Sequence, residues 1–168
     1  MRINEEPPKD GSLKPTIVLL SWFTFSYVVS YIGYTGRSQG LWFWYISLRR
    51  PDWDVPTWAF TPVWTVLYAF MGLSLWQIGK DPPGKLRTAN LVLLITLLSL
   101  SGVSPWVYFS SHQLLVSICL SGGTCLTALA AMISCWRQKP AVGQMLVPWV
   151  AWLSLSWILE FVIMKMNR

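Results

Sequence analysis

The amino-acid sequence predicts an all-α integral membrane protein, a bundle of five transmembrane helices. Of its 168 residues, 54% are hydrophobic and only 12% are charged, a composition typical of membrane proteins. Four tracts contain no Asp, Glu, Lys or Arg: residues 16–34, 57–79, 88–136 and 140–159. A helix needs roughly 20 apolar residues to cross the hydrocarbon core, so the long third tract holds two spans and the total is five.

The first 55 residues divide into a polar arm, a span and a loop. Residues 1–15 contain charges and prolines and are expected to form a disordered N-terminal arm. The first helix is expected at about Thr16–Tyr34, retained rather than removed as a signal peptide, because aromatic residues and no small-residue cleavage site follow it. The connection over residues 35–55 is the longest. It contains four consecutive aromatic residues near Arg49 and Arg50, which suits the headgroup level of a membrane, so we expect a short interfacial helix there that caps one mouth of the bundle.

Four further helices complete the transmembrane domain, which is expected to cover residues 16–168. Pro105, near the end of the third helix, removes a backbone hydrogen bond and predicts a kink there. The turn before the fourth helix is very short, so the third and fourth helices are expected to pack antiparallel. The expected bounds of helices two to five are Pro56–Gly79, Thr88–Phe109, Leu114–Trp136 and Val142–Met164.

The distribution of charge predicts the orientation and excludes several functions. The loops on the N-terminal side hold eight Lys and Arg residues against five on the other side, which favours a cytoplasmic N-terminus. The net charge of +6 is scattered, and no basic run is longer than Arg49-Arg50, so nucleic acid is not expected as a partner. The single histidine, His112, has no second ligand beside it and the three cysteines form no CxxC pair. We therefore expect neither a metal nor a cofactor.

Glu160 is the only acid of the fifth helix, and two interpretations of it stay open. It lies about one turn before Lys165, so it is either an interfacial charge that reaches water or this lysine, or a functional carboxylate inside the membrane. Ionisable groups at membrane depth are costly and usually serve a function.

Aromatic residues are the strongest functional signal in the chain. Catalytic templates such as G-x-S-x-G or a Walker loop are absent from the sequence, and the spans lack the charged rings of channels and the proton relays of pumps. Residues 41–76 hold half of the 12 tryptophans. Interfacial belts explain tryptophans near the ends of spans but not Trp64 at mid-depth. An apolar pocket with aromatic walls, which would bind a flat hydrophobic ligand, explains it better.

A longer motif runs through the same region. The chain has a Trp-Tyr pair at residues 44–45, then a basic residue with P-x-W-x-x-P-x-W at 50–58, and then P-V-W-x-x-L-Y-x-x-M-G at 62–72. This pattern resembles the signature of the translocator protein family, also called tryptophan-rich sensory proteins or peripheral benzodiazepine receptors. The similarity continues through Tyr108-Phe109 and residues 148–152, and covers residues 41–165.

The resemblance implies a five-helix bundle with a central pocket for tetrapyrroles, such as porphyrins and haem-related compounds, and for cholesterol or other sterol-like lipids. The loop after the first helix would close this pocket. The residues that the motif assigns to the ligand are Trp44, Tyr45, Trp53, Trp64, Trp152 and Ser156. A degenerate sterol-recognition pattern falls on Leu159, Phe161 and Lys165, with Phe in the place of Tyr.

The resemblance favours a membrane receptor or sensor and leaves two alternatives open. One is an enzyme that degrades porphyrin with light or oxygen through Trp64 and Trp152. The other is a transporter of porphyrin or cholesterol, which the odd number of spans disfavours because five spans do not form two equal repeats. The expected partners are a tetrapyrrole, a sterol-like lipid, the lipid bilayer and a second copy of the chain in a homodimer. Between the two membranes that the family occupies, the short N-terminal arm favours the bacterial envelope over the mitochondrial outer membrane.

Overall fold

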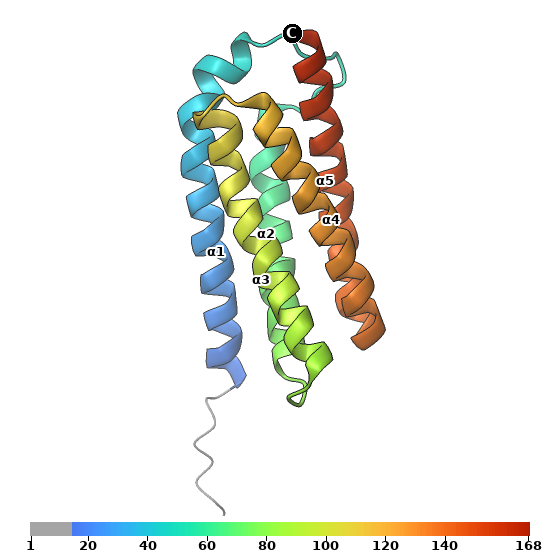
Figure 1. Ribbon diagram of the computed structural model, residues 1–168. Coiled ribbons are helices and arrows are strands. Elements are labelled where there is room, and N and C mark those ends of the chain that lie inside the picture. Colours follow the sequence, from blue (N-terminus) through green and yellow to red (C-terminus); the bar gives the residue numbers. More distant parts are fainter. Residues whose placement is uncertain (1–14) are drawn as a thin grey trace, which may run out of the picture.

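The computed structural model describes residues 15–168, and only the backbone of residues 39–42 (Figure 1). This part of the chain contains no strand and has five helices that are long and apolar enough to cross a membrane. The fold class predicted from the sequence is therefore confirmed. The expected disordered arm lies outside the described residues, except for Pro15. The helices are α1 (Pro15–Gly40), α2 (Thr57–Gly79), α3 (Lys85–Pro105), α4 (Leu114–Gln138) and α5 (Pro140–Met166), with two π-helical turns, η1 (Leu41–Tyr45) and η2 (Trp106–Ser110).

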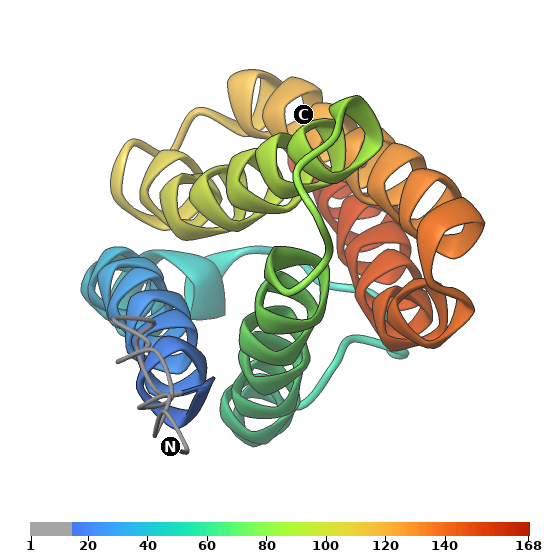
Figure 2. The same ribbon diagram turned by 90° about the horizontal axis from the view of Figure 1, so that it is seen from below.

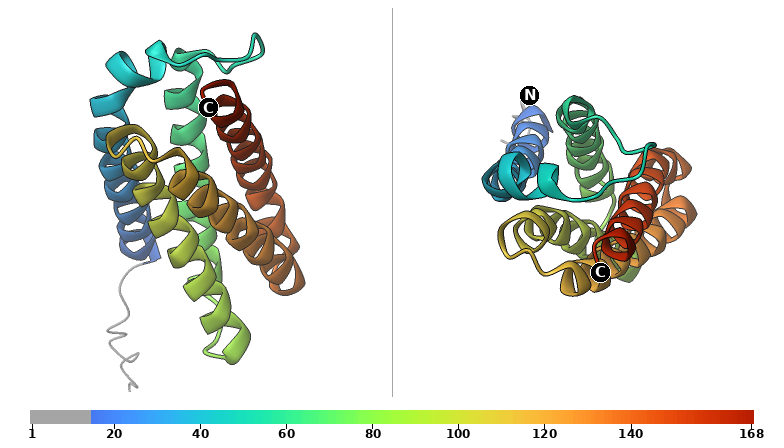
Figure 3. Two further views of the ribbon diagram at one scale, coloured as in Figure 1. Left: turned by 45° about the horizontal axis from the view of Figure 1, so that its top comes forward. Right: turned by 90° about the horizontal axis from the view of Figure 1, so that it is seen from above.

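The five helices form a closed ring. Neighbours around it are α1, α2, α5, α4 and α3, and α3 packs back onto α1 (Figure 2). The segment from η1 to α2 crosses one end of the ring and is called the lid here (Figure 3). The C-terminus lies at the lid end, whereas α1 begins at the opposite end (Figure 1). Only Lys139 separates α4 from α5, so these two helices run antiparallel in close contact.

Most helix ends lie within three residues of the expectation, and two differences bear on the site. The first helix continues past Tyr34 to Gly40, because Arg37 and Ser38 find hydrogen-bond acceptors in Thr61 and in the carbonyl of Thr35. The third helix changes to π-helical geometry directly after its proline. A proline has no backbone N–H to continue the α-helical ladder, and the wider turn is closed instead by a backbone bond over five residues, from Ser111 to Trp106. The expected kink is thus a π-helical turn.

The half of the bundle away from the lid is packed solid. Met71, Leu75, Leu94, Ala128 and Leu146 have no exposed surface and come from four different helices. The cluster that they belong to extends toward the lid along α5 as far as Leu153. Close packing of this kind excludes a ligand, so any site must lie in the half of the bundle next to the lid.

Polar contacts hold the end of the bundle opposite the lid. Lys139 Nζ donates to Asp81 Oδ1 at 2.5 Å and Gln138 Nε2 donates to Asp81 Oδ2 at 2.6 Å. Asn90 Nδ2 donates to Gln138 Oε1 at 2.6 Å. The hydrogen bond from the lysine lowers the pKa of the Asp81 carboxyl, so it stays an acceptor at neutral pH. These bonds join the α2–α3 turn to the α4–α5 junction.

Glycines allow α1 to approach α3 closely. An added Cβ on Gly33 would meet the backbone of Gly102 at 3.5 Å. At Gly36 a Cβ would lie 2.5 Å from the indole ring of Trp106, whose Nε1 donates to the carbonyl of Ile32 at 2.9 Å. The indole therefore bridges the two helices over a surface that tolerates no side chain.

We predict that Gly36→Ala destabilises the folded bundle by about 1 kcal/mol, because the cost of overpacking exceeds the gain in helix propensity. Gly123→Ala is the matched control, since that position is helical and has nothing within 4 Å of its added Cβ. Thermal unfolding in detergent measures both. A Gly36 variant as stable as the Gly123 variant would contradict the tight α1–η2 contact.

A two-part cavity beneath the lid

Two adjoining cavities occupy the half of the bundle next to the lid. The outer cavity has a volume of about 310 Å³ and is lined by α1, α2 and α3. The inner cavity has a volume of about 90 Å³ and is lined by the lid, η2 and all of the helices. The residues common to both walls are Arg37, Trp64, Ser101 and Pro105. These four side chains therefore mark the junction between the two cavities.

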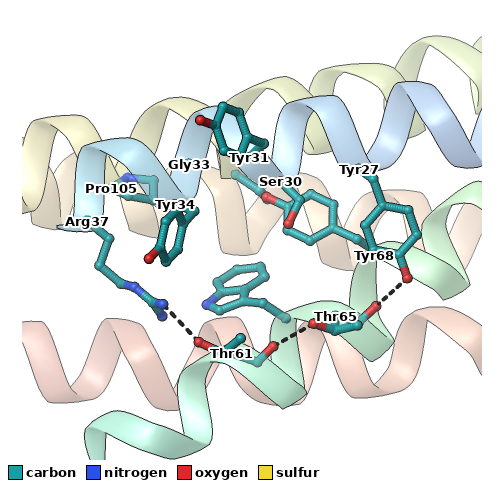
Figure 4. Close-up of a pocket in the computed structure, with 12 residues that line it drawn as sticks. Tyr27, Ser30, Tyr31, Gly33, Tyr34, Arg37, Thr61, Thr65, Tyr68 and Pro105 are labelled. Carbon is teal, nitrogen blue, oxygen red and sulfur yellow. Dashed lines mark hydrogen bonds between the residues drawn. The ribbon is translucent and has the colours of Figure 1, made fainter.

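The outer cavity is walled by tyrosines of α1 that face threonines of α2 (Figure 4). Tyr27 Oη donates to the carbonyl of Thr65 at 3.2 Å, and Arg37 Nη2 donates to Thr61 Oγ1 at 3.1 Å. Tyr31 is 68% exposed and lies on the rim. The outer cavity therefore reaches the surface of the bundle on its α1–α2 side.

Trp64 is the aromatic residue that faces both cavities. Its ring centroid lies 5.6 Å from Tyr68, 5.6 Å from Trp149 and 6.4 Å from Trp152. Trp149 is fully buried, and its Nε1 donates to the carbonyl of Leu67 at 2.8 Å. By contrast, Trp152 lines neither cavity and packs behind Trp64 against Phe60. The tryptophans form two layers, and only Trp64 is placed to touch a bound ligand.

The inner cavity has polar groups on an otherwise apolar wall. Glu160 Oε2 accepts hydrogen bonds from Ser117 at 3.1 Å and Ser121 at 2.8 Å, both on α4. Lys165 instead lies 5.6 Å from the ring of Phe161. The interpretation in which Glu160 pairs with this lysine is therefore wrong: the five residues between them turn the two side chains by more than a third of a helical turn from one another. The carboxyl group belongs to the cavity.

The lid is anchored by Tyr45, which is only 2% exposed. Its ring packs on Tyr108 and Phe109 of η2, and its Oη donates to Asp54 Oδ1 at 3.0 Å. Arg50 Nη1 donates to the other oxygen of that carboxylate at 2.6 Å. Burial, together with the neighbouring carboxylate, raises the pKa of Tyr45 well above its ordinary value, so the phenol remains a donor. The lid is thus held against the bundle by the ring of Tyr45, and the hydrogen bond to Asp54 connects two parts of the lid itself.

A second contact ties the lid to the end of α5. Asn167 Oδ1 accepts from the backbone N–H of Arg49 at 2.9 Å, and Asn167 Nδ2 donates to the carbonyl of Arg49 at 2.8 Å. The amide side chain therefore pairs with the lid backbone as a neighbouring strand would. The same Nδ2 also donates to the carbonyl of Ile163, which holds the side chain in position on its own helix.

The structure distributes the residues that the motif assigned to the ligand over three places. Tyr45, Trp64 and Ser156 line the cavities. Trp44 packs at the lid against Tyr108 and His112, and Trp53 is 50% exposed on the outer side of the lid. Trp152 lies in the layer behind Trp64. Of the sterol pattern, Leu159 faces the inner cavity, whereas Phe161 and Lys165 are on the exposed face of α5.

Sequence reasoning missed two groups that the structure brings to this site. Arg37 was assigned to a loop because the first helix was expected to end before it. Tyr108 was noted as part of a motif only, yet its hydroxyl is buried on the inner cavity wall without a hydrogen-bond partner in the described part of the chain. Ser117 and Ser121 could have been recognised from the sequence. Polar residues four apart in a charge-free span share one helix face, which predicts that this face contacts another polar group.

Other chemistry is sparse in the described residues. No group of three or more His, Cys, Asp or Glu side chains within residues 15–168 could hold a metal ion. The three cysteines of α4 are free thiols at three different levels of burial. The site of residues 15–168 is therefore an aromatic cavity with a few polar groups.

This arrangement defines a class: a multi-pass integral membrane protein built around a lidded aromatic cavity. The chain belongs to the TspO/MBR family, whose model matches residues 17–166, as the motifs indicated. It is 30% identical to the Translocator protein of Sus scrofa over 130 residues, 74% of this chain and 75% of the relative. It is 26% identical to Protein CrtK of Rhodobacter capsulatus (74% and 78% covered) and 25% identical to the Tryptophan-rich protein TspO of Chlorobaculum tepidum (83% and 89% covered).

We predict that Tyr45→Phe loosens and opens the lid, because the variant loses the hydrogen bond to Asp54 that connects the two parts of the lid, although the ring is kept. A hydrogen bond to a charged group contributes about 1.5 kcal/mol or more, which corresponds to an increase in the open population on the order of tenfold. Trypsin cleavage after Arg49 in detergent reports the open state. Trp53→Phe, an aromatic exchange at an exposed position of the same loop, should be cleaved by trypsin at the rate of the parent protein. Equal rates for the two variants would contradict the anchoring role.

Proposed function

We propose that this protein is a membrane receptor or sensor that binds a tetrapyrrole in the two-part cavity. The observation that carries the proposal is the position of Trp64, which faces both cavities at their junction. Flat apolar ligands bind well against aromatic faces in a site that excludes water. Membership of a family that includes tryptophan-rich and translocator proteins supports the same conclusion.

The dimensions of the site also support a flat ligand of moderate size. Small-molecule sites have volumes of roughly 300–1,000 Å³, and the outer cavity lies at the lower end of this range. Its exposed rim at Tyr31 lets a larger ring system project toward the lipid between α1 and α2. The inner cavity, at about 90 Å³, has room only for a substituent of the ligand.

We predict that protoporphyrin quenches the tryptophan emission of the purified protein and that Trp64→Phe weakens its binding by about 1 kcal/mol through lost contact area. Trp152→Phe is the matched control: the same exchange is made in the layer behind, where the indole N–H has no partner in the described chain. Fluorescence titration, corrected for absorbance by the porphyrin, gives both affinities. Absence of quenching at saturating porphyrin would refute the proposal, and equal losses in both variants would refute the assigned position of Trp64.

A second candidate function is porphyrin breakdown driven by light and oxygen. The observation that favours it is the contact of Trp64 with the rings of Tyr68, Trp149 and Trp152, a cluster of electron-rich groups beside the proposed ligand. Light-dependent bleaching of bound porphyrin tests it on the same variants. Loss of bleaching with retained binding in Trp64→Phe would favour the enzyme over the receptor.

Sterol binding through the C-terminal pattern has weaker support. Leu159 faces the inner cavity, while Phe161 and Lys165 face outward, so the three residues share no common surface. We therefore predict that Lys165→Ala leaves cholesterol affinity unchanged in a titration with the purified protein. A large loss in this single variant would show that the exposed face of α5 binds the sterol.

A further inference from the structure

Arg37 is a buried cation without an anionic partner. It lies in the last turns of α1 and is only 9% exposed. Its guanidinium lies 5.7 Å from the ring centre of Tyr34 and 5.6 Å from that of Phe60, and it donates one hydrogen bond to Thr61. Among residues 15–168, no carboxylate lies within 4.0 Å of its nitrogens. A guanidinium is always charged, so this site carries a positive charge that the described chain does not neutralise.

The position of this charge is at the junction of the two cavities. Arg37 lines both of them, together with Trp64. A guanidinium has five N–H donors in a planar fork, and one of them reaches Thr61. Figure 4 shows the side chain extending from α1 across the end of the outer cavity toward α2. A carboxylate in the junction would receive a pair of parallel hydrogen bonds, which is the geometry that arginine favours.

The inner cavity also has a carboxyl group in its wall. Glu160 lines that cavity, and its Oε2 already accepts hydrogen bonds from Ser117 and Ser121. No cation lies within 4.0 Å of it among the described residues. A ligand acid placed beside Glu160 would lose its hydration without gaining a donor pair, because the hydroxyl groups of Ser117 and Ser121 already donate to Glu160. The anion-binding end of the cavity is therefore at Arg37.

We infer that the site selects ligands with an acidic group, a carboxylate in particular, which Arg37 binds at the junction while the apolar body of the ligand lies in the outer cavity. This inference rests on the proposed function, because it assigns a specificity determinant within the same cavity. Aromatic contact with Trp64 provides affinity for any flat ring system. The guanidinium distinguishes ring systems with an acidic side chain from neutral ones of the same shape.

The test pairs a change in the ligand with a change in the protein. Protoporphyrin carries two carboxylic acids, and its dimethyl ester has the same ring without the charges. We expect the parent protein to bind the diacid at least tenfold more tightly than the ester. Arg37→Gln should abolish this preference and leave ester affinity unchanged, whereas Arg37→Lys should retain part of it. Arg137→Gln, which removes an exposed positive charge at the end of α4 away from the lid, should behave like the parent.

A further variant tests the polarity of the cavity. Glu160→Gln keeps the shape of the side chain and removes its charge, so it should bind the diacid at least as tightly as the parent does. A selective loss of the diacid in this variant would place the acidic group at Glu160 and overturn the inference.

The remaining outcomes distinguish a failure of this inference from a failure of the proposed tetrapyrrole-binding function. If neither porphyrin binds the parent protein, the proposed function fails. If both bind with equal affinity, the receptor proposal stands and the selectivity inference fails. If Arg37→Gln loses the diacid and the ester equally, the arginine only holds α1 against α2 and the inference is again overturned.

Discussion

The fully buried indole of Trp149 is the contact on which the site depends. It donates to the carbonyl of Leu67 and packs its ring against Trp64 and Tyr68, at the level where the solid half of the bundle ends. Away from the lid, small and aliphatic side chains fill the space between the helices. Toward the lid, the same helices enclose the two cavities, and Trp149 packs against Trp64 without lining either of them. A smaller residue there would leave Trp64 without support and would join the cavity to the core.

The membrane setting explains why the polar groups near the cavity are few and mostly paired. Inside the hydrocarbon region a helix must satisfy its backbone internally, and a proline interrupts that pattern. At Pro105 the chain responds with a π-helical turn, which the indole of Trp106 connects to α1. The turn also directs Tyr108 and Phe109 toward the lid, where they receive the ring of Tyr45. A break in regular structure thus supplies part of the cavity wall.

The sequence predicted the spans and the aromatic character of the site because both depend on composition along the chain. It could not fix the rotation of each helix about its axis, since α5 is apolar on every side. Trp149 and Trp152 are for this reason indistinguishable in the sequence, although Trp149 is fully buried and donates to the carbonyl of Leu67, whereas Trp152 packs against Phe60 and Trp64. Arg37 was missed for a related reason: hydropathy ended the first helix at Tyr34, whereas the structure continues it to Gly40.

The pairing of Asn167 with the backbone of Arg49 has a thermodynamic consequence for the proposed receptor. The lid contacts both the rings of η2, through Tyr45, and the end of α5, through this amide. A ligand that binds beneath the closed lid therefore stabilises a surface formed jointly by the lid and α5, outside the cavity itself. By linkage, a macromolecule that recognises this joint surface increases the affinity of the protein for its ligand. The ligand increases the affinity of the protein for that macromolecule by the same factor. For the proposed receptor, the joint surface of the lid and α5 is therefore the place where occupancy of the cavity would be recognised from outside the bundle.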